Sequence, residues 1–136
     1  MSYVSECAVA VIDDDERVLE SLENLLESAG HTVCLFSSAQ AFLEDEAFAK
    51  VDCLISDIGM PAIDGFELER LARAARPELS VILITGRQEL IKGPQATHRV
   101  GTRILLKPVG EQELLRAISN QNRLRVALLR AVHRYS

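Results

Sequence analysis

Three consecutive acidic residues, Asp13, Asp14 and Asp15, follow directly after an apolar run near the start of the chain. A fourth acidic residue, Asp57, ends a later apolar run, and Lys107 ends another. If these runs are parallel strands of one sheet, their carboxyl ends meet at one edge, where open α/β sheets place their ligand sites. Clustered carboxylates repel one another unless a hard cation such as Mg²⁺ lies among them. The spacing therefore predicts a small acidic site for Mg²⁺, faced by one basic residue.

Short apolar runs alternate along the chain with stretches in which apolar residues recur at helical spacing. The runs predict five strands, at residues 8–12, 32–36, 51–56, 81–84 and 104–106. The helical stretches predict helices near residues 18–26, 41–48, 66–72 and 111–129. Ser37 or Ser38 is placed to cap the second of these helices. Continuous apolar strands are typical of a sheet covered on both faces, so we expect an α/β fold with a doubly wound five-stranded parallel sheet.

The stretch 87–102 fits this alternation poorly. Gly93 and Pro94 interrupt any helix placed there, because proline lacks a backbone N–H and its ring clashes with the preceding turn. The apolar residues of the stretch also lack a clear helical period. We therefore expect the fourth helix to be shortened or irregular.

The composition is that of a globular domain of ordinary size, with 136 residues of which 48% are apolar and 26% charged. No apolar stretch approaches the roughly 20 residues that cross a bilayer, and residues 1–6 lack the pattern of a secretory signal. Cys7, Cys34 and Cys53 have no CxxC spacing, so we expect buried thiols in a reducing compartment. These features predict a cytoplasmic protein without membrane contacts.

Three histidines, His31, His98 and His133, lie far apart in the sequence. They lack the spacing of metal ligands. We interpret all three as surface residues, which argues against a phosphohistidine carrier.

The charges are unevenly distributed. The net charge is −5, yet arginines dominate the last third of the chain. The residues after Asn120 carry arginine and leucine at helical spacing without interleaved aromatic residues, so direct nucleic-acid binding is not predicted. We expect residues 1–120 to form the domain and residues 121–136 to extend its last helix. This extension would serve as a linker to an output domain, a kinase-docking segment or the contact of a homodimer.

Four of the five predicted strands end in residues that could act at a common site. These are the three acidic residues after the first strand, Asp57, Thr85 and Lys107-Pro108, with the turn residues Met60-Pro61 and Asp64-Gly65. Together they resemble the response-regulator receiver domain, the phosphoacceptor module of two-component signalling, across residues 7 to about 120. Residues 83–86 and 39–43 resemble the subgroup often joined to a helix-turn-helix output domain. The resemblance implies a flavodoxin-like (βα)5 fold.

The resemblance also implies roles for the acidic residues. Asp57 would accept the phosphoryl group as an acyl phosphate. Asp13, Asp14 and Asp57 would hold Mg²⁺ with the backbone carbonyl of Gly59, Asp14 as a direct ligand and Asp13 through water. Asp15 stands where the family often carries a second acid, and its part in the metal site is left open. For one or two of the three acids, the alternative is a helix N-terminus, whose dipole favours negative charge.

Two further residues complete the expected site. Lys107 would pair with carboxylate or phosphoryl oxygens as a point charge, and the Lys107-Pro108 bond is cis in the family. Thr85 would offer its hydroxyl to a phosphoryl oxygen, or would simply be a β-branched residue at a strand end. The phosphoryl donor would be a histidine kinase or a phosphotransfer protein, and the chain would act as a switch and not as an enzyme.

The sequence departs from the family pattern at residues that would transmit the effect of phosphorylation to the protein surface. Ile104 stands where the family often has an aromatic residue whose rotation reports phosphorylation, and isoleucine has no ring to rotate. Gly93 and Pro94 fall in the helix that usually contributes to the output face. We hypothesise that phosphorylation reorders residues 86–102 through Thr85.

Two other functions are compatible with the sequence. Residues 13–17 partly resemble the DxDx(T/V) start of haloacid-dehalogenase-type phosphatases, but Arg17 stands where threonine or valine is expected. The second is a receiver fold that docks a partner without regulated phosphorylation, although such a domain has no need of an acidic cluster. No GxxxxGK[ST] loop and no GxGxxG behind a strand are present, so the common nucleotide-binding motifs are excluded.

Overall fold

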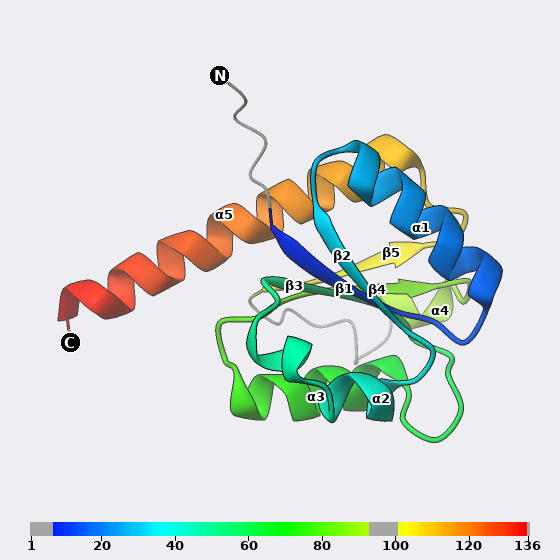
Figure 1. Ribbon diagram of the computed structural model, residues 1–136, viewed down its shortest axis with the longest axis horizontal. Coiled ribbons are helices and arrows are strands. Elements are labelled where there is room, and N and C mark those ends of the chain that lie inside the picture. The colour runs from blue at the N-terminus through cyan, green and yellow to red at the C-terminus, as the bar shows by residue number, and fades with distance from the viewer. Residues whose placement is uncertain (1–6, 93–100, 136) are drawn as a thin grey trace.

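The computed structural model describes residues 7–92 and 101–135. Within them, five parallel strands form one sheet in the order β2-β1-β3-β4-β5 (Figure 1). The strands are β1 (Ala8–Ile12), β2 (Thr32–Phe36), β3 (Cys53–Asp57), β4 (Ser80–Thr85) and β5 (Thr102–Leu106). The predicted doubly wound, flavodoxin-like sheet is therefore confirmed.

Helices cover both faces of the sheet. They are α1 (Glu16–Ser28), α2 (Ala39–Leu43), α3 (Gly65–Ala75), α4 (Glu89–Lys92) and α5 (Glu111–Tyr135), with a 3₁₀ turn η1 (Glu46–Ala49). In Figure 1, α1 and α5 lie on one face of the sheet, and α2 and α3 lie on the other. The longest helix, α5, continues past the edge of the sheet at which the strands begin (Figure 1).

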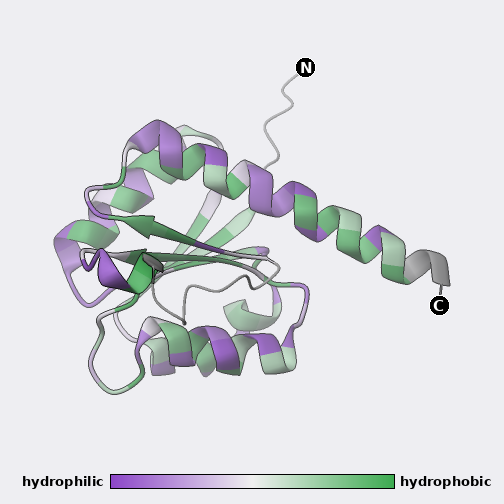
Figure 2. Cartoon of the chain, turned by 180° about the vertical axis from the view of Figure 1, so that it is seen from behind, coloured by the Kyte–Doolittle hydropathy of each residue, from purple (hydrophilic) through white to green (hydrophobic). Residues whose placement is uncertain are grey.

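The core consists of two apolar layers separated by the sheet. Alternate residues of each strand point to opposite faces, so Val9 and Val11 pack with α1 and α5, while Ala10 and Ile12 pack with α2 and α3. Figure 2 shows hydrophobic residues along the strands between the helices. Burial on both faces is the physical reason for the continuous apolar runs in the sequence.

The second helix differs from the prediction. One helix was expected across residues 41–48, but α2 ends at Leu43 and the 3₁₀ turn η1 follows. Ser38 caps α2, and the side chain of Asp45 accepts a hydrogen bond from the Ala47 amide (2.8 Å). A second capping residue inside the expected helix thus starts a new turn, because its carboxylate competes for a backbone N–H. The rings of Phe42 and Phe48 still contact each other, with centroids 5.2 Å apart.

The predicted irregularity of the fourth helix falls largely outside the described residues. The described part of α4 is one turn, Glu89–Lys92. Gly93 and Pro94, on which the prediction depended, lie beyond it.

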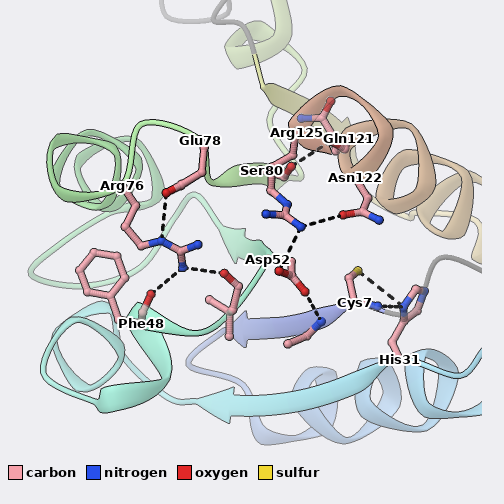
Figure 3. A network of polar contacts seen from close by, with 12 residues as sticks. Cys7, His31, Phe48, Asp52, Arg76, Glu78, Ser80, Gln121, Asn122 and Arg125 are labelled. Carbon is pink, nitrogen blue, oxygen red and sulfur yellow. Dashed lines mark hydrogen bonds and ion pairs between the residues drawn. The ribbon is translucent and has the colours of Figure 1, made fainter. Parts of the chain in front are cut away.

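The prediction that His31 lies at the surface is wrong. Its side chain is buried, and its Nδ1 accepts a hydrogen bond from the Cys7 backbone N–H (3.4 Å) at the start of β1 (Figure 3). His31 lies in the short turn between α1, which ends at Ser28, and β2, which begins at Thr32, and this turn brings its ring beside Cys7. His98 and the side chain of His133 lie outside the described part of the chain.

The cysteine prediction can be tested by alkylation at pH 8. Burial raises the pKa of the Cys7 thiol to about 11 and also raises that of the fully buried Cys53. At pH 8 the thiolate fraction of Cys7 is then about one in a thousand, and thiolate is the reactive form. We expect native protein to take up at most one carbamidomethyl group, on the half-buried Cys34, and unfolded protein to take up three. Mass spectrometry showing modified Cys7 or Cys53 in native protein would contradict the packing described.

Candidate functional site

The ends of β1 and β3 bring three carboxylates together. The two strands are neighbours, and Ile12 pairs with Ser56, so Asp13 and Asp57 leave the sheet side by side. One carboxylate oxygen from each of Asp13, Asp14 and Asp57 lies within 4.8 Å of the others. This place lies between β1 and β3, where the strand order reverses and open α/β sheets form their ligand crevice.

Asp13 is the buried member of this cluster. Its side chain is 5% exposed, and its Oδ1 accepts a hydrogen bond from the Asp15 backbone N–H (2.8 Å). Burial raises the pKa of Asp13, and the charges of Asp57 and Asp14 raise it further against the opposing effects of that hydrogen bond and of Lys107. The folded chain therefore holds this charge at a cost in free energy.

Lys107 offsets part of the negative charge. Its Nζ lies 2.9 Å from Oδ1 of Asp57, and its backbone N–H donates to the Thr85 carbonyl (2.7 Å), so β4 and β5 together position it. The Lys107-Pro108 bond is cis, as the family resemblance implied. Partial burial acts to lower the pKa of Lys107, but the hydrogen bond and charge of Asp57 outweigh that effect and raise it. The lysine is thus a stable cation at neutral pH.

Thr85 and Gly59 line the same pocket. It has a volume of about 590 Å³ and contains Asp57 and Lys107 as well as both residues. The Thr85 hydroxyl oxygen accepts a hydrogen bond from the Arg87 backbone N–H (3.0 Å), which leaves the hydroxyl hydrogen available to donate. The Gly59 carbonyl as a metal ligand stays a prediction.

Asp15 has a different position from its two neighbours. Its side chain caps α1 by accepting a hydrogen bond from the Arg17 backbone N–H (2.9 Å), and it is not part of the carboxylate cluster. This hydrogen bond lowers the pKa of Asp15. The helix-terminus explanation considered for the acidic triplet is therefore correct for Asp15.

The start of α3 closes the loop that follows Asp57. The Asp64 side chain caps this helix through the Glu67 amide (2.9 Å), and the Gly65 amide donates to the Ile58 carbonyl (2.9 Å). A Cβ at Gly65 would lie 2.8 Å from the carbonyl oxygen of Asp57 and 2.8 Å from Cα of Ile58. Only glycine permits this approach, so Asp64-Gly65 packs the helix directly against the backbone of the candidate nucleophile.

A second cavity that the sequence had not indicated adjoins the acidic cluster. It has a volume of about 750 Å³ and lies between α1 and the turn after β5. Val18, Leu22 and Val109 contribute apolar walls, and the polar lining residues are Asp13, Asp15, Arg17, Ser21 and Lys107. Its walls come from elements distant in sequence, so only the packing of α1 beside the turn after β5 reveals it.

The donor set suits Mg²⁺. This cation prefers oxygen ligands and is commonly bound by one or two carboxylates with several waters. Asp13, Asp14 and Asp57 offer such oxygens at the carboxyl ends of β1 and β3. Asp14 is exposed, so waters can reach an ion bound there. The ion would neutralise the mutual repulsion of the three carboxylates.

Fold and site together define a flavodoxin-like α/β domain with an acid-lined pocket that a lysine faces. Residues 9–119 match the family model described as the response regulator receiver domain. The chain therefore belongs to the family of response regulator receiver domains.

Similar proteins agree with this assignment. The chain is 34% identical over 113 residues to the response regulator protein TmoT of Ectopseudomonas mendocina, covering 83% of this chain and 51% of TmoT. It is 34% identical over 112 residues to the transcriptional regulatory protein FixJ of Bradyrhizobium diazoefficiens, covering 82% and 55%. A response regulator receiver domain from Clostridium thermocellum superposes with a TM-score of 0.77 at 31% identity, covering 89% of this chain and 98% of that domain. The chain spans about half the length of the curated relatives it matches.

Replacement of Gly65 by alanine tests the close approach of α3 to Asp57. We expect Gly65→Ala to lower the free energy of unfolding by roughly 1–3 kcal/mol, because its Cβ would overlap backbone atoms that cannot move aside independently. Gly59→Ala is the matched control, since a Cβ there meets nothing closer than Oδ2 of Asp57 at 3.9 Å. Urea unfolding measures both, and equal losses would show that the approach at Gly65 is not constrained.

The carboxylate cluster predicts a link between Mg²⁺ and stability. Without divalent cations, Asp13→Asn should raise the free energy of unfolding, because a buried charge with raised pKa is removed. Added Mg²⁺ should stabilise the unsubstituted chain by about 2.7 kcal/mol at 100 times its Kd, and the variant by much less. Asp15→Asn is the control, because asparagine also caps helices and Asp15 lies outside the cluster. An equal loss of the Mg²⁺ response in both variants would place Asp15 in the metal site.

Proposed function

We propose that the chain is a cytoplasmic phosphoacceptor that receives a phosphoryl group on Asp57 from a phosphohistidine of a kinase or phosphotransfer protein. The observation that carries this proposal is the contact between Lys107 Nζ and Oδ1 of Asp57 (2.9 Å) beside the three-carboxylate cluster. Membership of the receiver-domain family supports the same function. Mg²⁺ would be held by Asp13, Asp14 and Asp57, and by the Gly59 carbonyl.

The two oxygens of Asp57 have different surroundings. Oδ1 pairs with Lys107, whereas Oδ2 faces the loop at Gly59, which has no side chain to cover it. Oδ2 is therefore the nucleophile. It forms the new bond to phosphorus while the bond between phosphorus and the donor imidazole nitrogen breaks, and the electron pair of that bond returns to the imidazole.

The remaining residues stabilise charge and not covalent intermediates, as phosphoryl transfer requires. Lys107 stays protonated at neutral pH and compensates charge on the phosphoryl oxygens. The Thr85 hydroxyl donates its hydrogen to one of these oxygens, and it can do so while its oxygen accepts from Arg87. Mg²⁺ when bound supplies electrostatic neutralisation at the transferring group.

The cavity between α1 and the turn after β5 suits the docking of the phosphoryl donor. It opens beside Asp13 and Lys107, and its apolar walls at Val18, Leu22 and Val109 provide a surface for another protein. A histidine side chain presented there would approach the acidic cluster from the α1 side. The donor histidine would therefore reach Asp57 without displacing any strand of the sheet.

The chain acts as a switch and not as a phosphatase of external substrates. In the DxDx(T/V) pattern the second acid must face the first, but here Asp15 caps α1 and is engaged with the Arg17 amide. Phosphorylation would add about −1.5 to −2 charges beside Thr85 and change the protein contacts of the neighbouring surface. Any effect on nucleic acid would then be indirect, through an output domain in a longer protein. Residues 93–100 of the hypothesised responding segment lie outside the described chain.

Phosphorylation by acetyl phosphate tests the proposal. We expect intact-mass spectrometry to show one added phosphoryl group in the presence of Mg²⁺, and none after chelation. Asp57→Asn should abolish the addition because it removes the nucleophile. Asp52→Asn is the matched control, since Asp52 precedes β3 at the opposite edge of the sheet and should leave phosphorylation unchanged.

The donor is part of this test, because self-phosphorylation by acetyl phosphate can be slow. Phosphoramidate and a phosphorylated histidine kinase serve as second and third donors. Failure of the unsubstituted chain with all three donors would refute the proposal and favour a docking domain. Addition that persists in Asp57→Asn would move the acceptor to another residue.

A further inference from the structure

Arg87 is a cation beside Asp57 whose side chain has no part in the proposed function. The pocket of about 590 Å³ that contains Asp57 and Thr85 is also lined by Arg87. Among the described residues of this lining, Arg87 and Lys107 are the two cations. The Arg87 side chain is 70% exposed, so neighbouring atoms leave it free to change direction. A second positive charge is thus available at the opening of the pocket.

The backbone of Arg87 joins Thr85 to helix α4. Its N–H donates to the Thr85 hydroxyl oxygen (3.0 Å), and its carbonyl accepts from the Leu90 N–H (3.1 Å). These two hydrogen bonds hold the residue between the end of β4 and the first turn of α4, which follow each other in Figure 1. The Arg87 side chain therefore starts from a fixed point beside the pocket.

The guanidinium of Arg87 is paired with Glu89 at the surface. Its Nε lies 2.9 Å from Oε1 of Glu89, and the side chains are 70% and 64% exposed. The pKa of Glu89 is lowered by a hydrogen bond from its own backbone N–H and then by the one from Arg87. Water screens an exposed ion pair, so such a pair contributes little free energy. Arg87 can therefore leave Glu89 for a stronger partner.

The space between Arg87 and Asp57 is open. A Cβ at Gly86 would meet no described atom within 4 Å apart from its chain neighbours, and a Cβ at Gly59 would meet only Oδ2 of Asp57, at 3.9 Å. Both glycines line the same pocket as Arg87. A phosphoryl group on Oδ2 would thus enter open space that this arginine borders.

A phosphoryl group would be the stronger partner. It carries about −1.5 to −2 charges, whereas the carboxylate of Glu89 carries one. Arginine binds two phosphoryl oxygens at once with its planar fork of N–H donors, and such charge-assisted hydrogen bonds are among the strongest in proteins. Asp57 is also only 13% exposed, so charges at this site are less screened than those of Glu89. Each of these differences favours transfer of the guanidinium into the pocket.

We propose that Arg87 exchanges partners, from Glu89 in the unphosphorylated chain to the phosphoryl oxygens on Asp57 after phosphorylation. This inference rests on the proposed function, because it needs a phosphoryl group on Asp57. The exchange leaves the carboxylate of Glu89 unpaired in the first turn of α4. Phosphorylation then changes the charge that α4 presents to another protein, and no rotating ring at Ile104 is needed.

Titration with the beryllium trifluoride anion in the presence of Mg²⁺ tests the exchange. Its three fluorines stand in for the phosphoryl oxygens on Asp57, and fluorine NMR or calorimetry gives the Kd. Arg87→Gln should raise this Kd about tenfold or more, because a hydrogen bond to a charged group is lost. Glu89→Gln should lower it about two- to fivefold, because the competing carboxylate is removed. The double variant should have the Kd of Arg87→Gln, since Glu89 acts only through Arg87.

The ion pair between Glu67 and Arg70 on α3 provides the matched controls. It is also exposed, and neither residue lines the pocket of Asp57. Arg70→Gln and Glu67→Gln change the net charge by the same amounts and should leave the Kd within about twofold, because salt screens distant surface charges. Equal effects of Arg70→Gln and Arg87→Gln would overturn the exchange in favour of net charge alone. An effect of Glu89→Gln that persists without Arg87 would overturn it as well.

Acetyl phosphate labelling of the unsubstituted chain keeps this result separate from the proposed function. Labelling of Asp57 together with a trifluoride Kd that Arg87→Gln leaves unchanged would overturn the partner exchange alone. A chain that takes up no phosphoryl group from any donor and binds no trifluoride would overturn the proposed function, and the exchange would fall with it.

Discussion

Mutual repulsion among three carboxylates is the constraint on which the site depends. Oxygens of Asp13, Asp14 and Asp57 lie within 4.8 Å of one another, and Asp13 is buried. The fold holds them in place through the pairing of β1 with β3, and Lys107 compensates part of the charge. A cluster of carboxylates that the fold leaves negative is stabilised by a nearby cation such as the Lys107 ammonium, and a divalent cation would stabilise it further. The affinity for cations expected of this site thus follows from the repulsion among carboxylates that the strand pairing holds close together.

Carboxylates outside this cluster cap helices or join separate elements of the fold. Asp15 and Asp64 cap α1 and α3, and both helices begin beside the site. Asp52 lies at the opposite edge of the sheet, where it joins the first residues of β1 to Arg125 of α5. The same side chain therefore serves as charge, cap or anchor according to the backbone groups it meets. The edge of the sheet that carries the carboxylate cluster and the edge past which α5 continues are thus held by separate polar contacts.

Much of the fold could be predicted because it rests on local periodicity. Strands buried on both faces and helices with one apolar side leave patterns that are readable without neighbours. The places where prediction failed involve competition or distance. The Asp45 side chain accepts a hydrogen bond from the Ala47 amide and starts a new turn within the expected second helix, and His31 is buried beside Cys7. Neither outcome can be predicted from the local hydrophobic pattern.

The five strands, their parallel arrangement and the common edge reached by Asp57, Thr85 and Lys107 could all be inferred from the sequence. This is because apolar periods and strand ends are local properties, and parallel strands carry their ends to a common side. The cap that Asp15 forms on α1 and the ion pair between Asp52 and Arg125 became visible only in the folded chain. Those outcomes depend on which backbone groups and charges lie within hydrogen-bonding reach, and such distances exist only after the chain has packed.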